Sequence, residues 1–567
     1  MEKLSPHCNQ LNGATALNKS ELLLTTMAAD SDHILIDDET DALLGTESPL
    51  PTVRPRKTRE KPLVFVFLCV LIVFCIDFGN FLSVAPQTRI YEAIACRKYY
   101  EKHEPGQYRL LEDIPEDKCK IPPVQGELAF VQGLQISFEA LPSILLSIPY
   151  GRLADNVKYG RKFVLSLAVV GLLLNQFWVL LVCWFSRVMS LRAVWLGSAA
   201  LFIGGGAGVA LAMLMTMMTD VVEARYRSTA FFQIALAIVI TQFLAPLLAS
   251  WMMLKGSPWD PLFLGSICAT CSLPLLLIIP ETVHFRDLKS HLQPTSEDEY
   301  ASGEDVEDLF DTIHNSFSKP TLKHRLHLLR TATKSVIPNR TTALILWILF
   351  IANIGSKQLS IMLLYVSTRY GIPLSTANFS LTIFAGVNIF LLLVLLPTVS
   401  RYLTVNRRYT TATKDLILSR FSIIMYTLGA LCLGLAPTIA TMIAGLVIYT
   451  LGSGLGSLNA SMVATYVEPK HMARLYSVVS VVSMFGVFVG SPLLAGLFSL
   501  GLKMGKGWIG LPYFGITLLY GLIFVVVWFI RLPEKVNEAD DGNRDSEDDR
   551  YDVETPSSSL ILRSSNN

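Results

Sequence analysis

The stretch GRLADNVKYGRK, from Gly151 to Lys162, separates two long apolar runs and carries five charged side chains. The run before it covers residues 127–150 and the run after it covers 162–185, and each is long enough to cross a bilayer as a helix. A short loop rich in Arg and Lys is typical of the cytosolic side of a membrane protein. Retention on that side does not explain the acid, Asp155, or the two glycines.

Apolar runs continue in both directions from this loop. Hydrophobic residues make up 51% of the 567 residues and charged residues only 16%, which is more apolar surface than one soluble core can bury. The runs that approach or exceed the ~20 residues of a spanning helix lie at 62–84, 127–150, 162–185, 193–219, 229–254, 261–280, 342–366, 376–398, 417–436, 438–466, 475–500 and 511–531. The sequence therefore predicts an all-α membrane protein with twelve transmembrane helices.

Basic residues indicate how the chain is threaded. Arg54, Arg56, Lys57, Arg59 and Lys61 precede the first run, which places the N-terminus in the cytosol. An even number of spans then places the C-terminus there too, and the long polar start shows no cleavable signal peptide. The net charge of +1 gives no basic excess that would indicate nucleic-acid binding.

Polar segments divide the chain into parts. Residues 1–61 and 532–567 are rich in Ser, Asp and Glu and are expected to be disordered cytosolic tails. Residues 281–340 are expected to form a polar cytosolic loop between an N-terminal six-helix bundle, 62–280, and a C-terminal six-helix bundle, 341–531.

A short motif in the first tail bears on localisation. The residues ETDALL, with Glu39, Leu43 and Leu44, fit the acidic dileucine pattern that sorting adaptors bind. The motif favours a vacuole- or lysosome-like membrane, and the plasma membrane is the alternative.

The two predicted bundles repeat one another in sequence. Each half carries a glycine cluster, then an acid and an arginine, and then a proline followed by Leu-Leu-Ala. The first half has GGGAG at 204–208, Glu223, Arg227 and Pro246, and the second has GSGLG at 452–456, Glu468, Arg474 and Pro492. This order predicts two pseudo-symmetric bundles, an arrangement typical of secondary transporters with a solute site between the repeats.

The opening stretch resembles the cytosolic motif of the major facilitator superfamily, usually Gly-x-Leu-Ala-Asp-basic-x-Gly-Arg-Lys. It departs from that motif by two extra residues before Gly160 and by Asn156 where a base is usual. In the family the aspartate braces the outward-open state, which implies a latch role for Asp155, offered to a neighbouring helix N-terminus or an Arg. The implied gating motif comprises Gly151, Asp155, Lys158, Gly160, Arg161 and Lys162, and the pairs Glu223 with Arg227 and Glu468 with Arg474 are similar to the charge-relay residues that accompany it.

Further segments resemble fungal members of this superfamily. They are APQTRIYEAIACRKYY at 85–100, FEALPSILLSIPYG at 138–151 and LLYVSTRYG at 363–371. Animal folate and haem carriers are a more distant likeness. The fifth run lacks the Gly-x-x-x-Gly-Pro pattern typical of drug antiporters in the family, which disfavours drug antiport.

Three ionisable residues stand out within predicted spans, away from any loop: Asp77, Glu139 and Lys357. A charge in hydrocarbon costs on the order of 3 kcal/mol or more, so each should line a cavity or have a partner. For Lys357, extension of the side chain to the membrane surface is the alternative. No predicted span contains histidine, so a proton relay would use Asp77 or Glu139, although either acid could instead bind a cationic solute. Asp77 and Lys357 occupy equivalent positions of the two repeats, and the resemblance places them on opposite walls of a central cavity. We expect them to interact in one state of the protein.

Four polar residues within spans are candidates for contact with solute, namely Gln233, Gln358, Asn388 and Asn459. Hydrogen bonding between helices is the commoner use of such residues and is the alternative.

Two of the nine cysteines, Cys96 and Cys119, fall in the predicted exoplasmic loop 85–126, where the compartment permits oxidation. We expect a disulfide between them, and free thiols are the alternative. Closing a loop of this size stabilises a protein by roughly 3 kcal/mol in the chain-entropy model.

These observations favour a secondary transporter that moves a small-molecule solute by alternating access, coupled to protons. The alternative is a nutrient sensor on a transporter fold that does not itself transport. The sequence shows no nucleotide-binding loop, catalytic triad, metal-ligand cluster or cofactor fingerprint, so it predicts neither an enzyme nor a cofactor.

Overall fold

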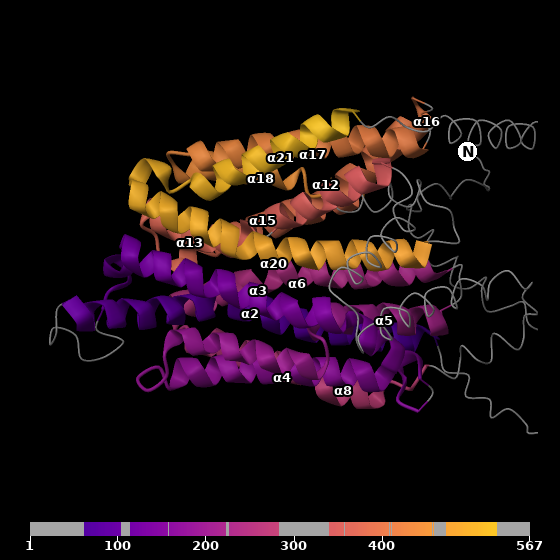
Figure 1. Ribbon diagram of the computed structural model, residues 1–567, viewed down its shortest axis with the longest axis horizontal. Coiled ribbons are helices and arrows are strands. Elements are labelled where there is room, and N and C mark those ends of the chain that lie inside the picture. The colour runs from indigo at the N-terminus through magenta and orange to yellow at the C-terminus, as the bar shows by residue number, and fades with distance from the viewer. Residues whose placement is uncertain are drawn as a thin grey trace, which may run out of the picture. The chain divides into compact units, whose positions relative to one another are not determined.

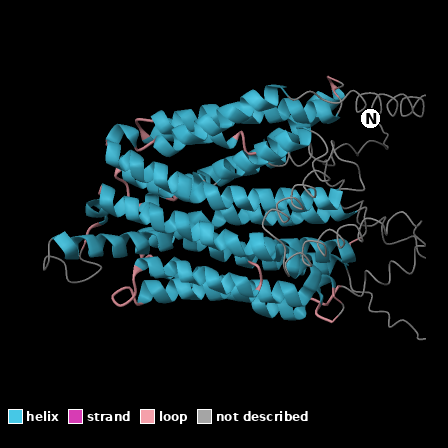
Figure 2. Cartoon of the chain, in the orientation of Figure 1, coloured by secondary structure: helices cyan, strands magenta, loops and turns pink. Residues whose placement is uncertain are grey.

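The computed structural model describes residues 62–103, 114–156, 158–222, 226–282, 340–356, 358–407, 409, 411–455, 458 and 472–529. Within these ranges the chain is helical with short turns, and none of them forms a strand (Figure 2). Several residues singled out in the sequence lie outside the described residues: Glu39, Leu43, Leu44, Glu223, Lys357, Asn459 and Glu468. The side chain of Arg474 also lies outside them.

The N-terminal helices occupy the first six predicted spans. They are α2 (Pro62–His103), α3 (Pro122–Asp155), α4 (Gly160–Trp184), the 3-10 helix η2 (Leu191–Ile203) with α5 (Gly206–Val221), α6 (Arg227–Lys255), and α7 (Trp259–Thr270) with α8 (Ser272–Ile278). A short 3-10 helix, η1 (Glu116–Cys119), precedes α3.

The C-terminal helices occupy the other six predicted spans. They are α12 (Arg340–Ser356) with α13 (Gln358–Tyr370), α14 (Leu374–Ala377) with α15 (Phe379–Phe390), the π-helix η5 (Leu391–Leu395) and α16 (Leu396–Val405), α17 (Thr411–Leu435), α18 (Ile439–Thr450), α20 (Met472–Met504), and η7 (Lys506–Trp508) with α21 (Leu511–Phe529).

The predicted set of spans is confirmed. Eleven described helical segments are long and apolar enough to cross a membrane, and the shorter apolar helix Ile439–Thr450 lies in the remaining predicted span. Membrane burial explains why the chain is helical, because a spanning helix satisfies its own backbone hydrogen bonds.

One predicted boundary is wrong. The sequence places an exoplasmic loop at 85–126, but α2 continues as a helix of 42 residues through Pro86 to His103. The polar residues of this extension pack against α3, where the Tyr91 hydroxyl donates a hydrogen bond to Gln135 Oε1 at 3.0 Å. The mixed polar and apolar residues therefore form a helix with a partly polar face here, and not a loop.

The two ends of α3 carry different features. The end of α3 near Pro122 carries a disulfide between Cys96 and Cys119, and we call it the disulfide end. The opposite end of α3 carries the stretch Gly151–Lys162, and we call it the motif end.

Buried apolar residues join the two sets of helices unevenly. One cluster combines C-terminal residues such as Tyr365 and Phe498 with N-terminal residues towards the disulfide end, such as Tyr91 and Leu128. A second cluster lies towards the motif end of the N-terminal helices and, among the described residues, includes no C-terminal one. Where the N-terminal and C-terminal helices meet, α20 runs beside α3 (Figure 1).

Candidate functional site

Glu139 lies at the centre of a polar network inside the membrane-spanning helices. It is seventeen residues from Pro122 and sixteen from Asp155, near the middle of α3. Its Oε1 atom accepts hydrogen bonds from Gln135 Nε2 at 3.0 Å and from Asn175 Nδ2 of α4 at 3.2 Å. Two amide donors therefore converge on one carboxylate oxygen at the depth where a charge costs most.

The network continues from α3 to α2. The Tyr91 hydroxyl, which is fully buried, donates to Gln135 Oε1 at 3.0 Å, and Gln87 Nε2 donates to the same hydroxyl at 2.9 Å. Gln87, Tyr91, Gln135, Glu139 and Asn175 thus form one chain across three helices, which we call the Glu139 network. Such a chain fixes its members in one orientation, because each side chain both positions and polarises the next.

A C-terminal residue reaches the same depth without a partner. Gln358, at the start of α13, is 2% exposed, and neither its Nε2 nor its Oε1 atom has a hydrogen-bond partner among the described residues. The depth of Gln358 follows from a contact between α13 and α3, in which Thr368 Oγ1 donates to Gln125 Oε1 at 3.1 Å. Gln358 lies ten residues from Thr368, and Gln135 lies ten residues from Gln125, so both are about 15 Å from this contact along their helices. A buried amide without partners costs free energy, so Gln358 remains a candidate for contact with solute or water.

The other predicted site residues in the spans lie apart from the Glu139 network. Asp77 precedes Tyr91 by fourteen residues on α2, about 21 Å along the helix axis, and no described residue donates a hydrogen bond to it. Gln233 is exposed on α6. Asn388 accepts a hydrogen bond from Ser453 Oγ at 2.7 Å, which is a contact between helices. The interaction of Asp77 with Lys357 stays a prediction.

At the motif end, Arg161 is the shared cation of two aspartates. Its Nη2 atom lies 3.2 Å from Asp155 Oδ1, and its Nη1 atom pairs with Asp220 Oδ2. The guanidinium also donates to Thr216 O at 3.3 Å, while Thr282 Oγ1 donates to Asp220 at 3.0 Å. The carboxylate of Asp155 therefore meets an arginine at the N-terminus of the next helix, α4.

A third acid at the motif end, Glu281, caps α4. Its carboxylate accepts from the backbone N–H groups of Arg161 at 3.0 Å and of Lys162 at 3.1 Å. A carboxylate at this position satisfies free backbone donors and is favoured by the helix dipole. Sequence analysis missed both Glu281 and Asp220. Their signal was an acid directly beside an apolar run, Glu281 after the sixth and Asp220 after the fourth.

The departures of the motif from the family pattern form a turn. Asn156 Oδ1 accepts from the backbone N–H of Lys158 at 2.9 Å, so the asparagine holds the turn where a base is usual. The turn ends at Gly160, whose φ of 77° lies in the left-handed region that favours glycine. No described atom lies within 4 Å of a Cβ built on Gly151.

The two motif glycines predict different responses to alanine. Gly160→Ala is expected to lower the free energy of unfolding by about 2 kcal/mol, because alanine is strained at this φ and its Cβ would collide with the Glu281 carboxylate. Gly151→Ala, in the last turns of α3, is the matched control and is expected to change it by less than ~1 kcal/mol. Thermal unfolding of the purified proteins in detergent measures both, and equal melting temperatures for the two variants would contradict this account.

Arg227, the first residue of α6, contacts the end of α5. Its guanidinium donates to Thr219 O at 3.0 Å and to Val222 O at 3.4 Å, the last carbonyls around α5. The charge-relay roles implied for Arg227, and for the pairs with Glu223, Glu468 and Arg474, stay predictions.

Comparison with known proteins places these features in a family. A family model described as the Major Facilitator Superfamily matches residues 67–413 and 416–565. The chain is 32% identical over 515 residues to the MFS efflux pump atnC of Emericella nidulans, covering 89% of this chain and 96% of that protein. It is 28% identical over 509 residues to the MFS-type transporter aprT of Aspergillus flavus, covering 90% and 95%.

A solved structure shares the fold. The crystal structure of a D-xylose-proton symporter matches with a TM-score of 0.53 at 14% identity, over 83% of this chain and 99% of that one. At this identity the likeness shows the arrangement of helices alone.

Proposed function

The chain belongs to the major facilitator superfamily, and from that premise we propose that it moves a small-molecule solute by alternating access, coupled to protons. The chain is a multi-pass membrane transporter, most like fungal members of the family, and not an enzyme.

The observation that carries proton coupling is the Glu139 network. A carboxylate in the middle of a span that is held by two amide donors can exist with or without its proton. Gln135 links it to the buried hydroxyl of Tyr91, so a change of protonation at Glu139 alters hydrogen bonds that connect α2, α3 and α4. We propose that Glu139 is the proton-coupling residue and that Gln358 contacts the solute from the opposite wall.

Alternating access is supported by the uneven contact between the halves. Hydrogen bonds between N- and C-terminal helices include Ser137 Oγ to Phe488 O at 2.8 Å, Thr368 Oγ1 to Gln125 Oε1 at 3.1 Å and Asn378 Nδ2 to Pro246 O at 2.8 Å. The last two lie towards the disulfide end. This is the pattern expected of a state that is closed at the disulfide end.

Orientation and direction follow from charge and from the relatives. The basic residues before α2 favour a cytosolic motif end and cytosolic termini, in the plasma membrane or a vacuolar membrane. A relative at 32% identity is named an efflux pump, so we propose export from the cytosol in exchange for protons. The missing Gly-x-x-x-Gly-Pro pattern in the fifth span argues that the solute differs from those of the family's drug antiporters.

Reconstitution of the full chain in liposomes tests this function. With an imposed proton gradient, the protein is expected to concentrate at least one member of a broad panel of radiolabelled solutes, and a proton ionophore should remove the concentration. A protein that binds a solute tightly but neither concentrates nor exchanges it would contradict transport and would favour a sensor.

A further inference from the structure

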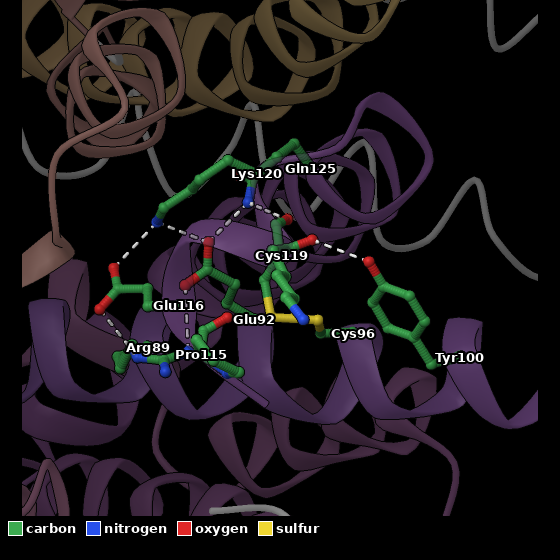
Figure 3. The surroundings of a disulfide bond; sticks show 10 residues. Arg89, Glu92, Cys96, Tyr100, Pro115, Glu116, Cys119, Lys120 and Gln125 are labelled. Atoms are coloured by element: carbon green, nitrogen blue, oxygen red, sulfur yellow. Dashed lines mark hydrogen bonds and ion pairs between the residues drawn. A yellow bond between two sulfur atoms is a disulfide. The ribbon is translucent and has the colours of Figure 1, made fainter. Parts of the chain in front are cut away.

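Two segments that resemble the family, one of which also supplies Gln87 and Tyr91 to the Glu139 network, meet at the disulfide end. Residues 85–100 lie on the outer part of α2, and residues 363–371 form the end of α13. Between them lies the segment that contains η1 and the start of α3, joined to α2 by the disulfide between Cys96 and Cys119 (Figure 3).

Around the disulfide, two carboxylates alternate with two cations. Lys120 Nζ lies 2.7 Å from Glu92 Oε1 and 2.9 Å from Glu116 Oε1. Arg89 lies 3.2 Å from each of the same carboxylates, and Glu92 is fully buried (Figure 3). The charges balance, so the cluster holds η1 against α2 without a buried excess charge.

This cluster extends hydrogen bonds to the C-terminal helices. Glu116 Oε1 accepts from the backbone N–H of Leu374, the first residue of α14, at 2.7 Å. Gln125 Nε2 donates to Glu92 at 2.6 Å, and Gln125 Oε1 accepts from Thr368 Oγ1 at 3.1 Å. The residues on either side of the turn between α13 and α14 are therefore bonded, the start of α14 to η1 and the end of α13 to α3.

These contacts are divided between the two halves in a way that suits a gate. The ion pairs all lie within the N-terminal helices, whereas the bonds made by Glu116 and Gln125 to Leu374 and Thr368 cross to the C-terminal helices. The turn can leave by breaking those crossing bonds while the ion pairs stay intact. Of the two crossing bonds, the one to Glu116 is charge-assisted and is therefore the stronger.

The disulfide fixes where Glu116 is presented. Cys119 is three residues after Glu116 in η1, and its carbonyl accepts from Gln125 Nε2 at 3.0 Å. The cross-link to Cys96 therefore anchors η1 to α2, and the salt bridges from Arg89 and Lys120 orient the carboxylate towards Leu374.

We propose that Glu116 is the residue that closes a gate at the disulfide end, and that the Cys96–Cys119 disulfide holds it in position. This proposal rests on alternating access, and it assigns the closed contact to Glu116 with Leu374 and to Gln125 with Thr368. Opening the disulfide end requires these contacts to separate in each cycle.

Distance measurements on the full-length protein in nanodiscs test the gate. Spin labels are attached through an encoded unnatural amino acid at Lys98 of α2 and Lys506 of η7, both exposed and both near the disulfide end, so that the disulfide stays intact. The parent is expected to give mainly a short distance. Glu116→Ala is expected to raise the ratio of the long to the short population at least tenfold.

A matched control and two further arms separate gating from general damage. Glu127 pairs with Arg192 at 2.9 Å near the same end and is half-exposed, so Glu127→Ala should leave the distances unchanged. Glu116→Gln keeps an oxygen for Leu374 and should shift the ratio less than alanine does. Reduction of the parent disulfide should shift it in the same direction as Glu116→Ala.

The outcomes are distinct. Parent-like distances in Glu116→Ala, or equal shifts in Glu116→Ala and Glu127→Ala, overturn the gate. If Glu116→Ala does not fold, parent-like distances in both Glu116→Gln and the reduced parent overturn it. Because the measurement needs no solute, the gate can hold even if the reconstituted protein transports nothing, which would overturn the proposed function alone.

Discussion

Replacement of Glu139 by glutamine is expected to reduce proton-driven concentration of the solute to the level of protein-free liposomes. Glutamine still accepts hydrogen bonds from Gln135 and Asn175, but it cannot bind and release a proton. Exchange of solute across the membrane without a proton gradient should persist, because the two halves can still alternate. Accumulation and counterflow assays on the same liposome preparations measure the two activities.

One control variant and one variant of the rival acid make this prediction specific. Glu127→Gln removes a carboxylate from the same helix at a half-exposed position and should leave both activities intact. Asp77→Asn tests the other acid, which lies nearer the motif end. Accumulation that survives in Glu139→Gln but is lost in Asp77→Asn would transfer the coupling role to Asp77.

The sequence predicts the helices well because the bilayer imposes a simple rule. A run of about 20 apolar residues must be a helix in hydrocarbon, and each predicted run coincides with a described helix. The rule fails where a helix leaves the membrane. Residues 85–103 continue α2 with a polar face whose partners, such as Gln125 and Gln135, are more than thirty residues away in sequence.

The candidate site could be predicted in part for a similar reason. Glu139 is identifiable as a carboxylate within an apolar run, and Gln135 is its neighbour one helical turn earlier, so this pair was within reach of pattern analysis. Tyr91 and Asn175 were not, because helix rotation decides which of many polar residues face α3. The same limit hid Asp220 and Glu281, which reach Arg161 from distant segments.

The largest expected loss of stability belongs to Arg161. Replacement by alanine removes the cation shared by Asp155 and Asp220, and both Arg161 and Asp220 have side chains that are nearly buried. Removal of one partner from a buried ion pair typically costs about 3–5 kcal/mol, because the remaining charge stays desolvated. Thermal unfolding in detergent, together with the yield of monodisperse protein, measures the loss.

The neighbouring residue and a double variant show whether charge is the cause. Lys162, whose Nζ donates to Leu277 O at 3.0 Å, is the matched control, and Lys162→Ala should cost less than ~1 kcal/mol because the contact is exposed. If the uncompensated aspartate causes the loss, adding Asp220→Asn to Arg161→Ala should recover part of it. A double variant less stable than Arg161→Ala alone would instead mean that packing of the guanidinium holds the motif end together, and the role of Arg161 as a shared cation would be wrong.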